Sequence, residues 1–154
     1  REFFDGPIAL SGSISEGSSV LSALALGADF AYVGTKFIAT EEANASPGYK
    51  QMIIDSTADD IMYSATFTGV NGNYLRPSVE AAGLNPEEHT SGSKDDMNFS
   101  TSAIAKKDNS SKAWKDIWGS GQGIGTIKDA PSVQTAVDQM VSEYEEAKSR
   151  LDNF

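Results

Sequence analysis

The chain has 154 residues and a formal net charge of −10, with 39% of its residues hydrophobic and 22% charged. Its Lys and Arg residues are dispersed, which excludes nucleic acid as the main partner, and its lack of cysteine excludes disulfides and thiolate zinc sites. No apolar run approaches the ~20 residues of a membrane span and no signal peptide is visible, so we expect a cytoplasmic protein without a membrane partner.

The N-terminal part of the sequence predicts a βαβ unit. Residues 7–11 form a short apolar run that ends at Gly12 and is typical of a buried parallel strand. Residues 16–28 have apolar side chains at helical spacing, with Gly27 at the expected helix end. Residues 30–33 form a second buried strand before Gly34 and Thr35. Strand, helix and strand over so few residues predict parallel strands joined by a right-handed crossover.

The middle of the sequence predicts short elements. Residues 37–45 and 48–56 are expected to be helices, and residues 61–68 alternate like a strand. Asn71, Gly72 and Asn73 have the composition of a turn. Residues 77–82 can begin a helix, because Pro77 is tolerated in a first turn.

The C-terminal half begins with a polar, Gly- and Ser-rich loop at residues 87–96. A helix is expected at residues 110–118, followed by a glycine loop from Gly119 to Gly125. Residues 132–151 form an acidic amphipathic helix. Its apolar stripe consists of Val133, Val137, Met140, Val141, Tyr144 and Ala147.

Two glycine turns are the first candidate site. Gly12 and Ser13 follow the first strand, and Gly34 and Thr35 follow the second, so parallel strands place both turns at one edge. Backbone N–H groups at Gly turns and helix N-termini bind anions. The alternative is that these glycines only make tight turns between strand and helix, and the residues alone leave both interpretations open.

The segment from Gly119 to Gly125 is the second candidate. Four of its seven residues are glycine, which allows close approach of backbone to a ligand. No strand runs into it and its spacing is not a dinucleotide-binding fingerprint. A flexible interdomain loop is an equal alternative.

Other chemically attractive side chains have simpler explanations. His89 lies in a polar loop, beside Glu87 and Glu88, without metal-ligand spacing, so we expect a solvent-exposed histidine and no metal site. The remaining acidic and aromatic candidates are assigned to solvated faces or to packing. The acidic group is Asp95, Asp96, Glu143, Glu145 and Glu146, and the aromatic group is Trp114, Trp118, Tyr63 and Phe67.

In this order, the motifs resemble the nitronate monooxygenase (2-nitropropane dioxygenase) family. Its members have a strand ending in Ala-Gly-Gly-Ile, an Ala-Leu-Ala-Leu-Gly-Ala-Asp helix end, a Gly-Thr-Arg-Phe strand end and a Thr-Glu-Glu segment. The corresponding residues here are Ser11 to Ile14, Ala23 to Asp29, Gly34 to Phe37 and Thr40 to Glu42, with further matches at Tyr49-Lys50, Phe67 to Gly69 and Gly121 to Gly123. The match is weakest at residues 71–112.

The resemblance implies an α/β fold, namely the C-terminal part of a TIM (β/α)8 barrel with a smaller α+β cap domain. Residues 1–45 would be the last two β/α units, residues 46–118 the cap, and residues 119–154 the glycine loop and the helix returning to the barrel. A complete barrel needs about 200 residues or more, so the missing N-terminal half or another chain is an expected partner. A first residue Arg1 suits a cut product.

The resemblance also implies FMN as cofactor and oxidation of an alkyl nitronate by O2. Gly12, Ser13, Gly34 and Thr35 would hold the FMN phosphate. Gly121, Gln122 and Gly123 would lie near the flavin.

The chain departs from the family at three points. Ser13 replaces a glycine, and we expect its N–H to remain available and its hydroxyl to add a donor, provided that Ser13 does not need a positive φ. Lys36 replaces an arginine, which we expect to be neutral. The family's catalytic histidine has no counterpart here, and His89 does not replace it. The alternatives are a flavin-dependent enoyl-ACP reductase and a non-catalytic fragment without cofactor.

Overall fold

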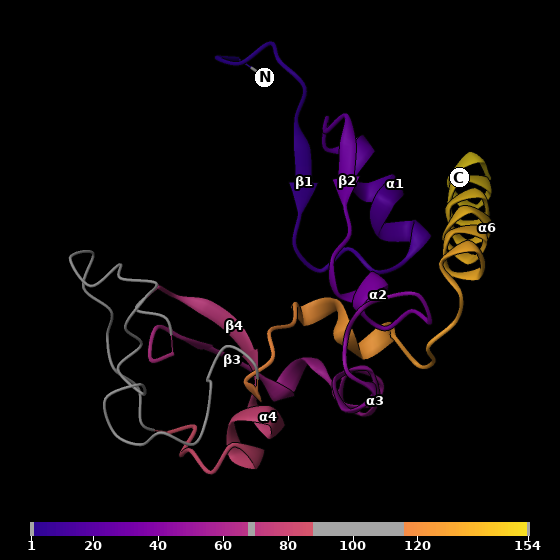
Figure 1. Ribbon diagram of the computed structural model, residues 1–154. Coiled ribbons are helices and arrows are strands. Elements are labelled where there is room, and N and C mark those ends of the chain that lie inside the picture. The colour runs from indigo at the N-terminus through magenta and orange to yellow at the C-terminus, as the bar shows by residue number, and fades with distance from the viewer. Residues whose placement is uncertain (1, 68–69, 88–115, 154) are drawn as a thin grey trace. The chain divides into compact units, whose positions relative to one another are not determined.

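The computed structural model describes residues 2–67, 70–87 and 116–153 (Figure 1). The chain divides into two compact units. The first unit is Arg1–Asp55 together with Gln122–Phe154, and the second is Ser56–Gly121. The expected division into residues 1–45, 46–118 and 119–154 remains a prediction.

A parallel strand pair forms the N-terminal part of the first unit. β1 (Ala9–Ser11) pairs with β2 (Phe30–Tyr32), and α1 (Gly17–Ala25) connects them (Figure 1). The Asp29 carboxylate accepts a hydrogen bond of 2.7 Å from the backbone N–H of Ile8 at the start of the pair. The predicted βαβ unit is therefore confirmed.

The expectation that both strands are buried is wrong for this chain by itself. All of β1 is exposed, and in β2 the side chains of Phe30 and Tyr32 are 61% and 66% exposed. Parallel strands are normally covered on both faces. Among the described residues, α1 is the helix that contacts β2, and no second layer covers the pair.

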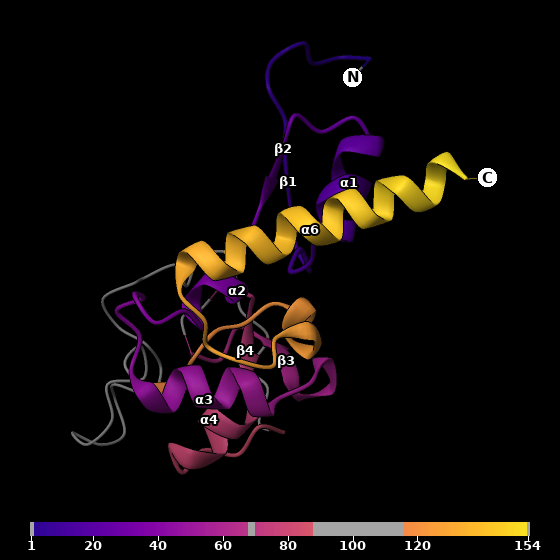
Figure 2. The same ribbon diagram turned by 90° about the vertical axis from the view of Figure 1, so that its right-hand side faces the viewer.

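The long helix α6 (Val133–Asp152) packs against α1 (Figure 2). The Ser132 side chain caps its first turn by accepting a hydrogen bond from the N–H of Thr135, which explains where the helix begins. The predicted helix is confirmed, but its buried face differs from the predicted stripe. The buried residues are Ala136, Met140 and Ala147, whereas Val137 and Val141 are exposed.

Three short helices complete the first unit. α2 (Thr35–Ile38) is much shorter than the helix expected at residues 37–45, and the Thr40 hydroxyl donates to the carbonyl oxygen of Phe37 at its end. α3 (Pro47–Asp55) agrees with the predicted helix. The 3-10 helix η4 (Gln122–Thr126) contacts both α2 and α3.

The second unit is built around an antiparallel pair. The 3-10 helix η1 (Ala58–Asp60) leads into β3 (Ile61–Ser64), which pairs with β4 (Gly72–Leu75), and α4 (Arg76–Ala81) follows with Pro77 in its first turn. Its core consists of Met62, Phe67, Val79 and Ile117.

One of the elements predicted for the second unit is wrong, and another is largely untested. The turn expected at Asn71 to Asn73 is incorrect, because Gly72 and Asn73 pair with Ser64 and Tyr63 in the sheet. The helix expected at residues 110–118 lies mostly outside the described residues. Its last residue is not helical, since the Trp118 carbonyl accepts the N–H of Leu75.

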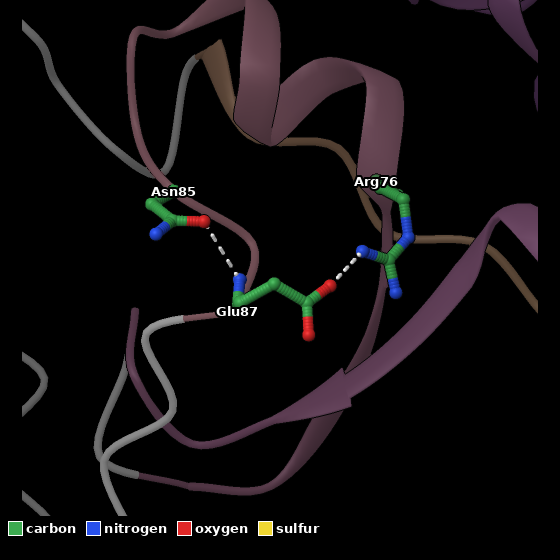
Figure 3. A network of polar contacts seen from close by, with 3 residues as sticks. All are labelled: Arg76, Asn85 and Glu87. Atoms are coloured by element: carbon green, nitrogen blue, oxygen red, sulfur yellow. Dashed lines mark hydrogen bonds and ion pairs between the residues drawn. The ribbon is translucent and has the colours of Figure 1, made fainter.

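The loop expected at residues 87–96 is described only at Glu87. The Glu87 carboxylate pairs with the Arg76 guanidinium at 2.6 Å, and its N–H donates to the Asn85 side chain (Figure 3). Glu88, His89, Asp95, Asp96 and Trp114 lie outside the described residues. Among the helices that the structure describes, none is both long and apolar enough to cross a membrane.

Candidate functional site

The two glycine turns of the first unit lie at the same edge of the parallel pair. Ser11 and Tyr32 are the last paired residues of β1 and β2 and stand opposite each other. Gly12 and Ser13 follow the first strand directly, and Gly34 lies two residues after the second. Because parallel strands end at a common edge, the two turns are neighbours, as predicted.

The turn after β1 has an unusual backbone. Gly12 has φ +103° and the next residue, Ser13, has φ +55°. Glycine tolerates positive φ freely, whereas a residue with a Cβ pays about 1–2 kcal/mol for it. The condition attached to Ser13 is therefore not met: the position needs a positive φ, and serine adopts it at a cost.

Backbone donors at these turns are open to a ligand. Within the described part of the chain, the N–H groups of Gly12, Ser13 and Gly34 donate to no acceptor. A Cβ placed on Gly12 or Gly34 would meet nothing within 4 Å. Converging donors without obstructing side chains are what an anion requires.

The N-terminus of α1, in contrast, is already satisfied by the protein. The N–H of Gly17 donates to Oε2 of Glu143 at 2.7 Å, and Glu16 and Ser19 form a capping box. Glu143 was expected on the wet face of α6, and that expectation is wrong. A phosphate at this edge would therefore meet the turn at Gly12 and Ser13 rather than the first turn of α1.

η4 packs directly against the turn after β1. A Cβ on Gly123 would lie 2.8 Å from Ser15 Oγ and 3.0 Å from the carbonyl carbon and oxygen of Ser13. The Thr126 hydroxyl donates to Ser15 Oγ at 2.9 Å. A flexible loop is therefore the wrong interpretation for residues 122–125.

Within the first unit, the turn after β1, the turn between β2 and α2, and η4 thus bring the candidate site residues together. Gly121 belongs to the second unit. Gln122 is exposed at the start of η4, and Thr35 is the first residue of α2, which contacts η4.

Lys36 is a residue whose environment the sequence did not reveal. It lies in α2 directly after Thr35, and it is only 7% exposed. No described residue pairs with its ammonium group. No buried side-chain nitrogen or oxygen atom of the described residues lacks a hydrogen-bond partner, so the stem of Lys36 is covered while its unpaired ammonium still reaches solvent. The sequence around Lys36 did not predict its burial, because a four-residue helix is too short to show a hydrophobic period.

Other candidates lie away from these turns. Phe67 is buried and packs edge-on against Tyr74, with ring centroids 4.9 Å apart, which confirms a packing role. Tyr63 is exposed, so the packing role expected for it is wrong. Among the described residues, no group of acidic or histidine side chains is arranged to hold a metal ion.

Comparison with known proteins identifies relatives over most of the chain. The sequence model of the family described as nitronate monooxygenase matches residues 2–143. A nitronate monooxygenase from Paraburkholderia phytofirmans is 31% identical over 80 residues, which are 52% of this chain and 22% of the relative.

Solved structures show the same fold. Nitroalkane oxidase from Streptomyces ansochromogenes aligns with a TM-score of 0.71 and 26% identity, over 98% of this chain and 43% of that one. FabK from Thermotoga maritima aligns with a TM-score of 0.66 and 21% identity, over 97% of this chain and 48% of that one.

The chain therefore spans less than half the length of these solved structures and about a fifth of the curated relative. The predicted fold class is confirmed: the chain has the α/β fold of the C-terminal part of a TIM barrel, with a smaller α+β unit.

Proposed function

The chain belongs to the nitronate monooxygenase family of flavin-dependent oxidoreductases, and from this premise we propose that it supplies the FMN phosphate site of an enzyme that oxidises alkyl nitronates with O2. FMN, when bound, supplies the redox chemistry. The chain's own residues bind and orient it. The observation that carries the proposal is the pair of adjoining turns with unpaired N–H donors.

Gly12, Ser13, Gly34 and Thr35 would hold the phosphate. A phosphate dianion is best stabilised by several converging N–H donors, and two turns at one strand edge offer them. The open space in front of Gly12 and Gly34 fits a bulky anion.

Gly121, Gln122 and Gly123 remain proposed neighbours of the flavin. His89 has no proposed role, and the base that deprotonates the substrate is assigned to residues outside this chain. Small-molecule nitronate and O2 would reach the flavin in the complete enzyme.

Equilibrium titration of FMN into the complete enzyme tests the site. Thr35→Ala removes one hydroxyl and leaves the backbone donor. A hydrogen bond to a charged group contributes about 1.5–3 kcal/mol, so binding should weaken about tenfold to a hundredfold. Gly34→Val should cost more, because its branched side chain enters the space in front of the turn.

Gly34 has φ −114°, outside the left-handed region that favours glycine, and an added Cβ would meet nothing within 4 Å, so a folded variant is expected. His89→Ala is the control and should leave FMN binding and turnover unchanged. A folded Gly34→Val variant that binds FMN as tightly as the parent contradicts the proposed site.

Two measurements separate the alternatives. Rapid reduction of the bound flavin by NADH in the complete enzyme would favour a flavin-dependent enoyl-ACP reductase. Purified complete protein without flavin absorbance would favour a non-catalytic protein.

A further inference from the structure

We propose that Gly123 is a positioning residue, which acts on the cofactor through Ser13 rather than by touching the flavin. This inference rests on the proposed FMN site. The absence of a side chain at Gly123 lets η4 press on the turn after β1 and hold Ser13 in the left-handed conformation that presents the backbone donors of the turn.

The contact leaves no room for a side chain. A Cβ on Gly123 would lie 3.0 Å from both the carbonyl carbon and the carbonyl oxygen of Ser13, and 2.8 Å from Ser15 Oγ. The Ser15 hydroxyl can rotate, but the two Ser13 atoms are backbone and move only if the turn moves. Any added carbon at Gly123 therefore displaces the residue that would carry a phosphate donor.

η4 does not move away from the contact easily, because it is tied to the same turn and to the core of the first unit. Ile124 is completely buried, and Ser15 is 4% exposed with its hydroxyl bonded to Thr126. A buried side chain in the middle of η4 and a hydrogen bond at its C-terminal end thus hold η4 in the first unit.

Ser13 needs such support. Its φ of +55° costs about 1–2 kcal/mol, and a strained residue persists only where its surroundings determine the conformation. Gly123 lies against the carbonyl group of Ser13, where even a single added Cβ would come within 3.0 Å of it. Affinity for the phosphate is therefore coupled to the packing of η4.

The test compares Gly123→Ala with Gly125→Ala in the complete protein. Both glycines lie in η4, and a Cβ on Gly125 would meet nothing within 4 Å, so the two variants differ in the contact with the turn. Dissociation constants are measured for FMN and for riboflavin, which lacks the phosphate, by flavin fluorescence. We expect Gly123→Ala to weaken FMN by about tenfold or more and riboflavin much less. Gly125→Ala should change neither.

Two further variants extend the test, and the first keeps it decisive if Gly123→Ala does not fold. Thr126→Val removes the hydrogen bond to Ser15 without adding bulk and should weaken FMN about threefold to tenfold with riboflavin unchanged. Ser13→Gly, added to Gly123→Ala, should recover part of the FMN affinity, because glycine lets the displaced turn find another conformation.

Equal FMN affinities of Gly123→Ala and Gly125→Ala overturn the inference, and so do equal losses of FMN and riboflavin, which would point to a ring contact or a general loss of structure. A parent protein that binds neither flavin overturns the proposed function itself. That result is distinct from a parent that binds FMN and is insensitive at Gly123.

Discussion

Ser13 adopts φ +55° at the turn after β1, where a side chain with a Cβ is disfavoured by about 1–2 kcal/mol. Glycine would remove this strain, although the greater freedom of the unfolded chain offsets about 0.4–1 kcal/mol of the gain. A β-branched residue would increase the strain, since valine at positive φ is a severe outlier. The conformation can therefore be tested by stability alone, without any cofactor.

We expect Ser13→Gly to unfold at the same urea concentration as the parent or slightly above it. Ser13→Val should lower the free energy of unfolding by about 1–2 kcal/mol. Both values come from urea unfolding of the flavin-free complete protein. Identical midpoints for the glycine and valine variants would show that residue 13 is not left-handed.

Lys36 gives a second test at the residue scale. Lys36 directly follows Thr35 in α2 and its ammonium has no partner among the described residues, so in the proposed site it would face the phosphate that Thr35 helps to hold. Lys36→Met should therefore weaken FMN binding about tenfold to a hundredfold and affect riboflavin little. Lys128→Met, at an exposed position, is the matched control. Equal losses for both flavins would assign the ammonium to a protein carboxylate instead.

At this scale the sequence located the turns but not their environments. Gly12 and Gly34 could be placed because a glycine directly after an apolar run marks a strand end. The turn at Ser13 is contacted by η4, which lies more than a hundred residues away in the sequence, and the burial of Lys36 is likewise a property of the folded unit. Local spacing has no information about such a contact.

Among the helices that the structure describes, α1 and α6 make the most extensive contact. Glu143 joins the two helices, because its carboxylate accepts a hydrogen bond of 2.7 Å from the N–H of Gly17. Glu143→Ala should lower the free energy of unfolding by about 1–2 kcal/mol, and Glu143→Gln should lose less because the amide oxygen still accepts. Chemical denaturation measures both.

Glu145→Ala is the control for this prediction. Glu145 is exposed two residues further along α6, so the change should stay within about 0.5 kcal/mol. Similar effects at the two positions would mean that the hydrogen bond from Gly17 to the Glu143 carboxylate does not stabilise α1.

Tyr49 in α3 gives a prediction for pH. Burial raises the pKa of its phenol above the ordinary value of 10.0, because desolvation disfavours the phenolate. The folded state then holds its proton more tightly than the unfolded state, so this contribution to stability is full below pH 10 and is lost as pH rises through the folded pKa. Tyr49→Phe should make the decline in stability above pH 10 less steep. The same decline in the variant would contradict this assignment.

Helices and strands were predicted correctly where the hydrophobic pattern extended over the whole helix or strand. The βαβ unit and α6 follow from helical spacing and from strand runs that end in glycine. The turn predicted at Asn71 to Asn73 failed because pairing with β3 overrode local turn preference. The buried face of α6 was predicted in part: Met140 and Ala147 of the expected stripe are buried, whereas Val137 and Val141 are exposed and the small residue Ala136 is buried instead.

For the whole molecule, the exposed strand pair has a measurable consequence. Leu10 and Phe30 are exposed on β1 and β2, and exposed strands with apolar side chains promote association. We expect the 154-residue chain alone to self-associate in sedimentation velocity experiments. A variant with Leu10→Lys and Phe30→Lys should associate less. A clean monomer of the unmodified chain would contradict the expectation.

The first unit also has a discontinuous path along the chain. The donor Gly17 and its acceptor Glu143 are 126 residues apart, on either side of the second unit. During synthesis, α1 leaves the ribosome long before α6 exists to cover it. At roughly 5–20 residues per second, the nascent chain would expose the uncovered face of α1 for about 6–25 s. The β3–β4 hairpin, by contrast, pairs residues close in sequence and can form while translation continues. A long-lived, uncovered helix next to an exposed strand pair favours aggregation during folding, so the α1 segment is where the nascent chain is most vulnerable to misfolding.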